Sequence, residues 1–162
     1  MSVLMIDAAT PADVPTILRL IRALADYEKL SDQVVATEAR IHEALFGERP
    51  AAECLIARED GVAAGFALFF HNFSTFRGQR GIYLEDLFVD PAYRGRGYGR
   101  ALLQRLAQLA EVRDCARLEW SVLDWNAPAI GFYESLGARR LNEWQIYRLT
   151  GDALHAFANA PA

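Results

Sequence analysis

The chain has 162 residues, the size of one domain, and we predict a single domain over residues 1–162. Hydrophobic residues make up 52% of the sequence, enough for a full core, and the longest apolar run, residues 62–70, is too short to cross a membrane. The formal net charge of −4 argues against a general nucleic-acid binder and is compatible with a cationic substrate.

Three further features bear on the class of protein. Residues 1–15 lack a basic segment followed by an apolar run, so no signal peptide is expected. Cys54 and Cys115 lie in apolar, strand-like segments and are expected to be buried and reduced, as in a cytoplasmic protein. The histidines show no ligand spacing to one another or to a cysteine, so no metal site is expected.

Local patterns predict strands and helices along the whole chain, with no internal repeat or linker. The predicted strands cover residues 3–6, 53–58, 62–70, 83–89, 116–122 and 144–149. The predicted helices cover residues 11–27, 38–46, 100–113, 127–136 and 152–158. This order predicts an α/β domain.

Capping and turn residues support these boundaries. Thr10 and Thr37 are suitable N-caps for the first two helices, and Gly47 is suited to end the second. Asp60-Gly61 between two strands is a strong hairpin signal. Residues 71–81 are predicted to form a loop.

The first helix ends in the sequence Asp26-Tyr27-Glu28. The helix dipole disfavours anions at a C-terminal end, so this clustering of acids carries a small cost. Two interpretations stay open: an ordinary solvated helix end, or a contact surface for a cationic substrate.

Residues 83–113 predict a strand, a tight glycine loop and a helix in that order. Glycines just ahead of a helix let its first backbone N–H groups approach an anion, and the helix dipole favours negative charge there. Arginines in the same loop add positive charge. The glycines are Gly95, Gly97 and Gly99, and the arginines are Arg94, Arg96 and Arg100. We therefore predict a site for a ligand with several phosphate charges.

Two common phosphate-binding motifs do not fit this loop. A Walker loop ends in Gly-Lys-Ser/Thr, whereas Gly99 is followed by Arg100-Ala101. A dinucleotide-binding fold needs G-x-G-x-x-G early in a βαβ unit, and this loop lies past the middle of the chain. The spacing Arg94-x-x-Gly97-x-Gly99 instead resembles the acetyl-coenzyme A pyrophosphate loop of the GNAT N-acetyltransferases.

A second segment carries the same resemblance. Asn126-x-x-Ala-x-x-Phe-Tyr-x-x-x-Gly-Ala, ending at Ala138, is similar to the family's other recurring segment. The first helix, through Tyr27-Glu28, and the run Tyr83-Leu84-Glu85-Asp86 resemble the spermidine/spermine (diamine) and thialysine branch in particular. The resemblance covers nearly the whole chain.

The resemblance implies both a fold and an activity. The fold is a mixed, mostly antiparallel sheet flanked by helices and splayed between the fourth and fifth strands, where the cofactor enters. The activity is N-acetylation of a small primary amine, such as a polyamine, a diamine or a thialysine-like amino acid, by direct attack on the thioester of acetyl-CoA. The branch is dimeric, so a homodimer is expected, with no nucleic-acid or membrane partner.

The resemblance also implies roles for particular residues. Tyr133 occupies the general-acid position near the coenzyme A sulfur, and Glu85 helps to bind the amine and relays its proton through water. The other expected positions fall into cofactor-binding and substrate-binding sets. The cofactor set is Leu87, Phe88, Val89, Arg94, Gly95, Arg96, Gly97, Tyr98, Gly99, Arg100, Asn126, Ala127, Pro128 and Ala129, and the substrate set is Tyr27, Glu28, Glu85, Glu119, Trp120 and Ser121.

These roles fit the chemistry of acetyl transfer to an amine. An aliphatic ammonium has a pKa near ~10.4, so a base or a proton relay must neutralise it before it attacks. A phenol is a suitable acid for the departing thiolate because its pKa of ~10 lies close to that of a thiol. The alternative interpretations are that Tyr133 only packs, that Glu85 is a solvated carboxylate and that Glu119 and Trp120 are ordinary strand residues. Asp86 is expected to be structural.

The acceptor stays open, because Glu119-Trp120-Ser121 departs from the corresponding stretch of the polyamine enzymes. The insertion that those enzymes can carry between the second and third strands is also reduced to Glu59-Asp60-Gly61. Acetylation of protein, peptide or aminoglycoside amines is an alternative, and so is a coenzyme A-binding regulatory module without turnover.

Overall fold

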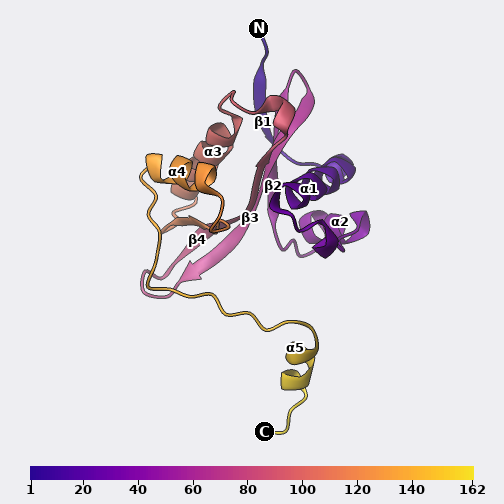
Figure 1. Ribbon diagram of the computed structural model, residues 1–162, viewed down its shortest axis with the longest axis vertical. Coiled ribbons are helices and arrows are strands. Elements are labelled where there is room, and N and C mark those ends of the chain that lie inside the picture. The colour runs from indigo at the N-terminus through magenta and orange to yellow at the C-terminus, as the bar shows by residue number, and fades with distance from the viewer. The chain divides into compact units, whose positions relative to one another are not determined.

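The computed structural model covers residues 1–162 and divides into two parts, residues 1–121 and residues 122–162. The first part contains a five-stranded sheet with α1 and α2 on one face and α3 on the other (Figure 1). Its strands are β1 (Leu4–Ala8), β2 (Glu53–Glu59), β3 (Val62–Ser74), β4 (Gln79–Val89) and β5 (Leu118–Trp120). Its helices are α1 (Val14–Glu28), α2 (Glu38–Phe46) and α3 (Tyr98–Val112), with short 3-10 helices at Pro11–Asp13, Ser31–Gln33 and Pro91–Tyr93.

The strands lie in sequence order, β1-β2-β3-β4-β5, because tight hairpins join the central ones. All neighbouring pairs are antiparallel except β4 and β5, which are parallel and are connected through α3. Asp60 and Gly61 form the β2–β3 turn with positive φ at both positions, as the Asp-Gly signal predicts. The predicted mixed, mostly antiparallel sheet is confirmed.

Apolar side chains fill both faces of the sheet. On one face the core comprises Ile17, Leu20, Leu45, Cys54, Ile56, Phe66 and Phe88. On the other face, α3 presents Leu102, Leu103 and Leu106, all nearly or fully buried. These residues recur at helical spacing, so the apolar stripe seen in the sequence is the face that α3 buries.

The sheet opens between β4 and β5. Their parallel pairing covers only three positions and ends where Leu84 lies opposite Trp120. The β3–β4 register shifts at the next residue, because Phe69 pairs with Leu84 while Leu68 pairs with Asp86, which leaves Glu85 as the extra residue of a bulge. Beyond this bulge β4 continues with β3 alone, so the predicted splay between the fourth and fifth strands is confirmed.

Two predictions about the strands are corrected. Residues 71–81 are mostly strand, since β3 and β4 extend to a turn at residues 75–78 in which Gly78 has φ 62°. The fifth strand is shorter than predicted and covers only Leu118–Trp120. Both differences arise because strand length depends on the partner strand as well as on local β-propensity.

The second part contains two helices, α4 (Ala127–Ser135) and α5 (Gly151–Ala158). The predicted strand at residues 144–149 is wrong, since no helix or strand lies between α4 and α5. A strand requires a partner for its backbone groups, and β-forming side chains alone do not supply one. The side chains of Trp144, Ile146 and Tyr147 are 75%, 80% and 89% exposed.

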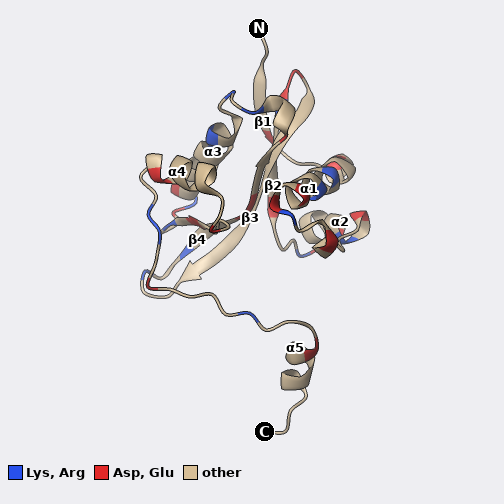
Figure 2. Ribbon diagram, viewed as in Figure 1, with Lys and Arg blue, Asp and Glu red and all other residues tan.

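Charged residues are spread along the chain. Lys and Arg occur on α1, α2, α3 and the loops and do not gather on one element (Figure 2). Both cysteines are free, with Cys54 buried as predicted and Cys115 only partly buried. None of the helices is long and apolar enough to span a bilayer.

Candidate active site

The loop between β4 and α3 depends on its glycines. Gly95 and Gly97 have φ of 77° and 81°, a left-handed conformation that favours glycine, and Gly97 is the N-cap of α3. A Cβ at either position would meet no atom within 4 Å, so the space beside the loop is open. The first hydrogen bond of α3 runs from the Ala101 amide to the Gly97 carbonyl at 3.0 Å. The amides before Ala101 have no partner within the helix, which suits an incoming phosphate.

The side chain of Arg94 extends from the loop to α1. Its Nε donates a hydrogen bond to the Val89 carbonyl at 2.9 Å. Its guanidinium carbon lies 4.8 Å from the centre of the Tyr27 ring and 5.4 Å from that of Phe88. These cation–π contacts connect the predicted cofactor loop with the predicted substrate end of α1.

Arg96 and Arg100 have different surroundings. Arg96 forms an ion pair with Glu59 at 2.6 Å, so its charge is neutralised within the protein. Arg100 is exposed and forms no ion pair. Of the three loop arginines, Arg100 therefore has its charge most available to an anion.

Three acids gather where α1 ends beside β4. Glu28 is the last residue of α1, and burial raises the pKa of its carboxyl. Asp86 lies opposite Leu68, on the sheet face that packs against α1. Burial, together with the nearby charges of Glu85 and Glu28, raises the pKa of Asp86 to about 6. This cluster gives the face a negative potential that favours a cation.

The open edge of β4 follows directly on this cluster. From Asp86 to Val89 the strand pairs only with β3, so its other edge has no neighbouring strand, although the Val89 carbonyl accepts a hydrogen bond from Arg94. Phe88 is buried in the core, whereas Leu87 and Val89 are half-buried. Trp120, the last residue of β5, is half-buried as well. An extended polar ligand can use the backbone groups of this edge as a neighbouring strand does.

The two other predicted substrate residues of the β5 region have local partners. The Glu119 carboxylate lies 2.6 Å from Arg117 Nε and accepts a hydrogen bond from Asn72 Nδ2 at 3.2 Å. The hydroxyls of Ser121 and Tyr83 lie 2.7 Å apart. Asn72 Oδ1 is buried without a hydrogen-bond partner. The hydrogen bond from Asn72, on β3, gives Glu119 a structural role in joining β5 to the β3–β4 hairpin.

The remaining predicted residues belong to the second part. Asn126 caps α4 by accepting a hydrogen bond from the Ala129 amide at 3.4 Å, and Pro128 stands in the first turn, as the sequence predicts. Tyr133 lies near the end of α4, is half-buried, and has its ring centre 5.6 Å from that of Phe132. Gly137 has φ 89° just past the helix end, as expected of a C-terminal stop.

Sequence reasoning missed Glu59 and treated Asp86 as structural. Glu59 is 8% exposed, and its carboxylate accepts hydrogen bonds from Arg96 and Tyr98, which lie 37 and 39 residues further along the chain. No local pattern signals such a distant pair. The acid pair Glu85-Asp86 on a strand was visible in the sequence, but the burial that shifts the pKa of Asp86 was not.

A mixed sheet that opens beside β4, followed by a glycine loop at a helix N-terminus, defines the architecture of an N-acetyltransferase. The acetyltransferase (GNAT) family profile matches residues 19–138, which is most of the chain. The chain therefore belongs to the GNAT acetyltransferase family, and it is an acyltransferase. The acetyltransferases of this family take the acetyl group from acetyl-CoA.

Individual relatives agree with this assignment. A thialysine N-epsilon-acetyltransferase from Bos taurus is 40% identical in an alignment 169 residues long, gaps included, which covers 98% of this chain and 99% of that protein. An L-ornithine N5-acetyltransferase from Arabidopsis thaliana is 36% identical over 193 residues, covering 91% of this chain and 85% of that protein. Among solved structures, an integron cassette protein from the mobile metagenome of V. cholerae is 28% identical with a TM-score of 0.82, covering 97% of this chain and 98% of that one.

Proposed function

We propose that this protein transfers the acetyl group of acetyl-CoA to the side-chain amine of a small cationic substrate, such as thialysine, ornithine or a diamine. The observation that carries the proposal is the spatial order of three features in and next to β4. An acidic cluster of Glu28, Glu85 and Asp86 is followed by an open strand edge and then by the glycine loop. A cationic amine and a phosphate-bearing thioester fit the two ends of this arrangement.

The proposed substrate class is supported by the relatives. The names of the two similar proteins place the acetyl group on a side-chain nitrogen, N-epsilon of thialysine and N5 of ornithine. Such an amine is positively charged at neutral pH. The acids Glu28, Glu85 and Asp86 supply the negative charge that binds it.

We further propose roles for the residues in the transfer itself. Glu85, set apart by the bulge, binds the ammonium and accepts its proton through water, which leaves a neutral nitrogen. The nitrogen attacks the thioester carbonyl carbon and the C–S bond breaks, while Tyr133 gives its phenolic proton to the departing thiolate. The proton that the nitrogen loses as the amide forms passes through water and restores the phenol. Backbone groups at Leu87 and Val89 hold the donor along β4, and the loop amides at Gly97 to Gly99 bind its pyrophosphate.

The experiment is a steady-state measurement of thiol release from acetyl-CoA with a panel of acceptors. Thialysine, ornithine, lysine and spermidine represent the proposed class, and an aminoglycoside and a lysine-containing peptide represent other acceptors. We expect the highest kcat/KM with an amino-acid or diamine acceptor. Preference for the aminoglycoside or the peptide would reassign the acceptor, and no turnover with any amine would leave a coenzyme A-binding module.

One substitution tests the acidic end within the same assay. Glu85→Gln keeps the shape of the side chain and removes its charge, so KM for the amine should rise by about 10–100-fold, the scale of a lost charge-assisted contact. KM for acetyl-CoA should stay unchanged. Glu48→Gln, at an exposed position after α2, is the matched control. Equal effects of Glu85→Gln on both substrates would return Glu85 to a solvated-surface role.

We also propose that residues 1–162 act as one N-acetyltransferase domain, because the family match at residues 19–138 runs through both parts of the structure. A homodimer is proposed as well, supported by the exposed apolar side chains at Trp144, Ile146 and Tyr147. A cytoplasmic location is supported by the two free cysteines.

A further inference from the structure

The carboxylate of Glu59, the last residue of β2, contacts Arg96 in the glycine loop and Tyr98 at the start of α3. Glu59 Oε1 accepts a hydrogen bond from the Tyr98 hydroxyl at 2.8 Å, and both of its oxygens lie 2.6 Å from a terminal nitrogen of Arg96. The same guanidinium donates to the Ala92 carbonyl at 3.3 Å. Glu59 and Tyr98 are 8% and 7% exposed, so these contacts are shielded from water on the carboxylate side.

The two partners of Glu59 stand on either side of Gly97. Arg96 precedes this N-cap residue, and Tyr98 is the first residue of α3. The loop at residues 94–97 is otherwise exposed and contains two glycines in the left-handed conformation. Glycine leaves the backbone with more conformations than any other residue, so a loop of this kind needs an external restraint to hold one of them. Glu59 supplies restraint at both neighbours of Gly97.

The electrostatics of the group match this role. The Tyr98 hydroxyl and the Arg96 guanidinium hold the pKa of the Glu59 carboxyl below its usual range, so it is ionised at neutral pH. The hydrogen bond to Glu59 raises the pKa of the Tyr98 phenol, so that group remains a donor. With its charge neutralised by Glu59, Arg96 shapes the loop, whereas the exposed Arg100 is available to an anion.

We propose that Glu59 is a positioning residue for acetyl-CoA binding, which acts through Arg96 and Tyr98 to hold the amides after Gly97 in the orientation that binds pyrophosphate. This inference rests on the proposed function. It changes the role of Arg96 from a direct phosphate ligand to a support of the loop. It also adds the β2–β3 hairpin, which precedes the site in the sequence, to the elements that form the site.

The test compares Glu59→Gln with the wild-type protein using two acetyl donors. Glutamine keeps the volume and removes the charge, so KM for acetyl-CoA should rise by about 10-fold or more, the scale of a lost charge-assisted hydrogen bond. The kcat at saturating donor and KM for the amine should stay within about twofold. S-acetylpantetheine lacks the pyrophosphate, so both proteins should use it equally well. A merely structural role would affect both donors alike.

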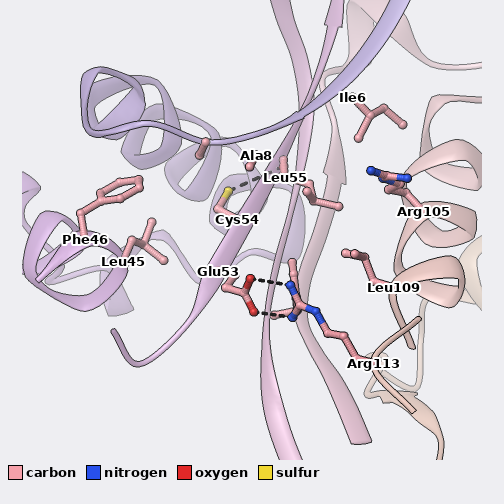
Figure 3. A pocket seen from close by; sticks show the side chains of 12 residues that line it. Ile6, Ala8, Leu45, Phe46, Glu53, Cys54, Leu55, Arg105, Leu109 and Arg113 are labelled. Atoms are coloured by element: carbon pink, nitrogen blue, oxygen red, sulfur yellow. Dashed lines mark hydrogen bonds and ion pairs between the residues drawn. The ribbon is translucent and has the colours of Figure 1, made fainter. Parts of the chain in front are cut away.

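Glu53→Gln provides a matched control. Glu53 begins β2 as Glu59 ends it, and it forms a bidentate ion pair with Arg113, at 2.7 and 2.9 Å, at the far end of α3 (Figure 3). This pair lines a separate cavity of about 270 Å³. The substitution removes a comparable pair between the same strand and the residue after the same helix. It should leave KM for acetyl-CoA unchanged.

Tyr98→Phe keeps the test decisive where Glu59→Gln fails to fold, since it retains the buried ring and removes only one hydrogen bond. It should raise KM for acetyl-CoA by a few-fold and leave S-acetylpantetheine unaffected. Suppose that the wild-type protein turns over amines and that Glu59→Gln or Tyr98→Phe leaves KM for acetyl-CoA unchanged. That result would overturn the positioning role of Glu59 and leave the proposed function intact. If the wild-type protein turns over no amine, the proposed function fails, and the role of Glu59 is then tested by calorimetry of coenzyme A binding. Weaker binding by the variants than by the wild type supports the positioning role. Equal binding, or no binding by any of the proteins, overturns it.

Discussion

Asp86 carries its charge at a position where burial and two neighbouring acids oppose it. Burial, together with Glu85 and Glu28, raises its pKa to about 6 from an ordinary value of 3.8. Below about pH 4 the carboxyl is protonated in both the folded and the unfolded chain. As the pH rises through about 4 to 6, the unfolded chain loses this proton first, so the free energy of unfolding falls. Above pH 6 the ionised Asp86 lowers the free energy of unfolding by its full amount, on the order of 3 kcal/mol.

Asp86→Asn should therefore stabilise the protein in a pH-dependent way. The amide cannot ionise, so the variant avoids the cost that the wild type bears above pH 6. We expect its thermal midpoint to exceed that of the wild type by several degrees at pH 8, at about 2–4 °C per kcal/mol for a chain of this size, and by little at pH 4. Asp32→Asn, at an exposed position, is the control. An equal difference at both pH values would contradict the assigned ionisation.

Tyr133 is the residue on which the chemistry of the proposed reaction depends most. Tyr133→Phe keeps the ring, and hence its contact with Phe132, and removes only the phenolic proton. The kcat should fall by about 10²–10⁴-fold, the usual scale of general-acid catalysis, while coenzyme A affinity and the thermal midpoint change little.

The assay of Tyr133→Phe should include a fast acceptor amine and a slow, weakly basic one, because departure of the thiolate limits the rate only with some acceptors. Full kcat with both acceptors would make Tyr133 a packing residue.

Elements whose signals are local were predicted well from the sequence. The first three long helices and the Asp60-Gly61 turn follow from caps, apolar periodicity and turn chemistry, which act over a few residues. The Glu85 bulge, the short β5 and the missing strand at residues 144–149 depend on pairing with distant segments. The candidate site divides in the same way. Its glycine loop was visible as a motif, whereas the support from Glu59 joins residues almost forty positions apart.

The loop that precedes α3 can be tested as one element through Gly97. A β-branched side chain at φ 81° is strained, and it also stands where a phosphate would approach the amides. We expect Gly97→Val to lower coenzyme A affinity by about 10-fold or more, measured by calorimetry, since several backbone hydrogen bonds to the anion are lost together.

The control for Gly97→Val is Gly78→Val in the β3–β4 turn. Gly78 has φ 62°, and a Cβ there also meets no atom within 4 Å, so the backbone strain is comparable. Both variants should lose thermal stability, but Gly78→Val should keep full coenzyme A affinity. Equal affinities of the two variants would show that the glycine loop does not bind the cofactor.

At the scale of the whole molecule, the distribution of apolar surface is uneven. In the first part, the sheet and its helices bury their apolar faces in a continuous core. Large apolar side chains are exposed throughout residues 141–157, including Trp144, Ile146 and Phe157. Exposed apolar side chains of this kind are suited to burial against another surface. A second copy of the chain is the partner that we propose.

The dimer predicts a mass of twice 18.1 kDa by size-exclusion chromatography with light scattering, and a return toward 18.1 kDa on dilution. Ile146→Glu should shift the protein to the monomer mass, because a charge that becomes buried at an apolar interface is costly to desolvate. Val112→Glu is the matched control, since Val112 is 84% exposed and Ile146 is 80% exposed. It should leave the dimer intact. A wild-type mass of 18.1 kDa at every concentration would contradict the dimer, and equal dissociation by both variants would remove residues 141–157 from the interface.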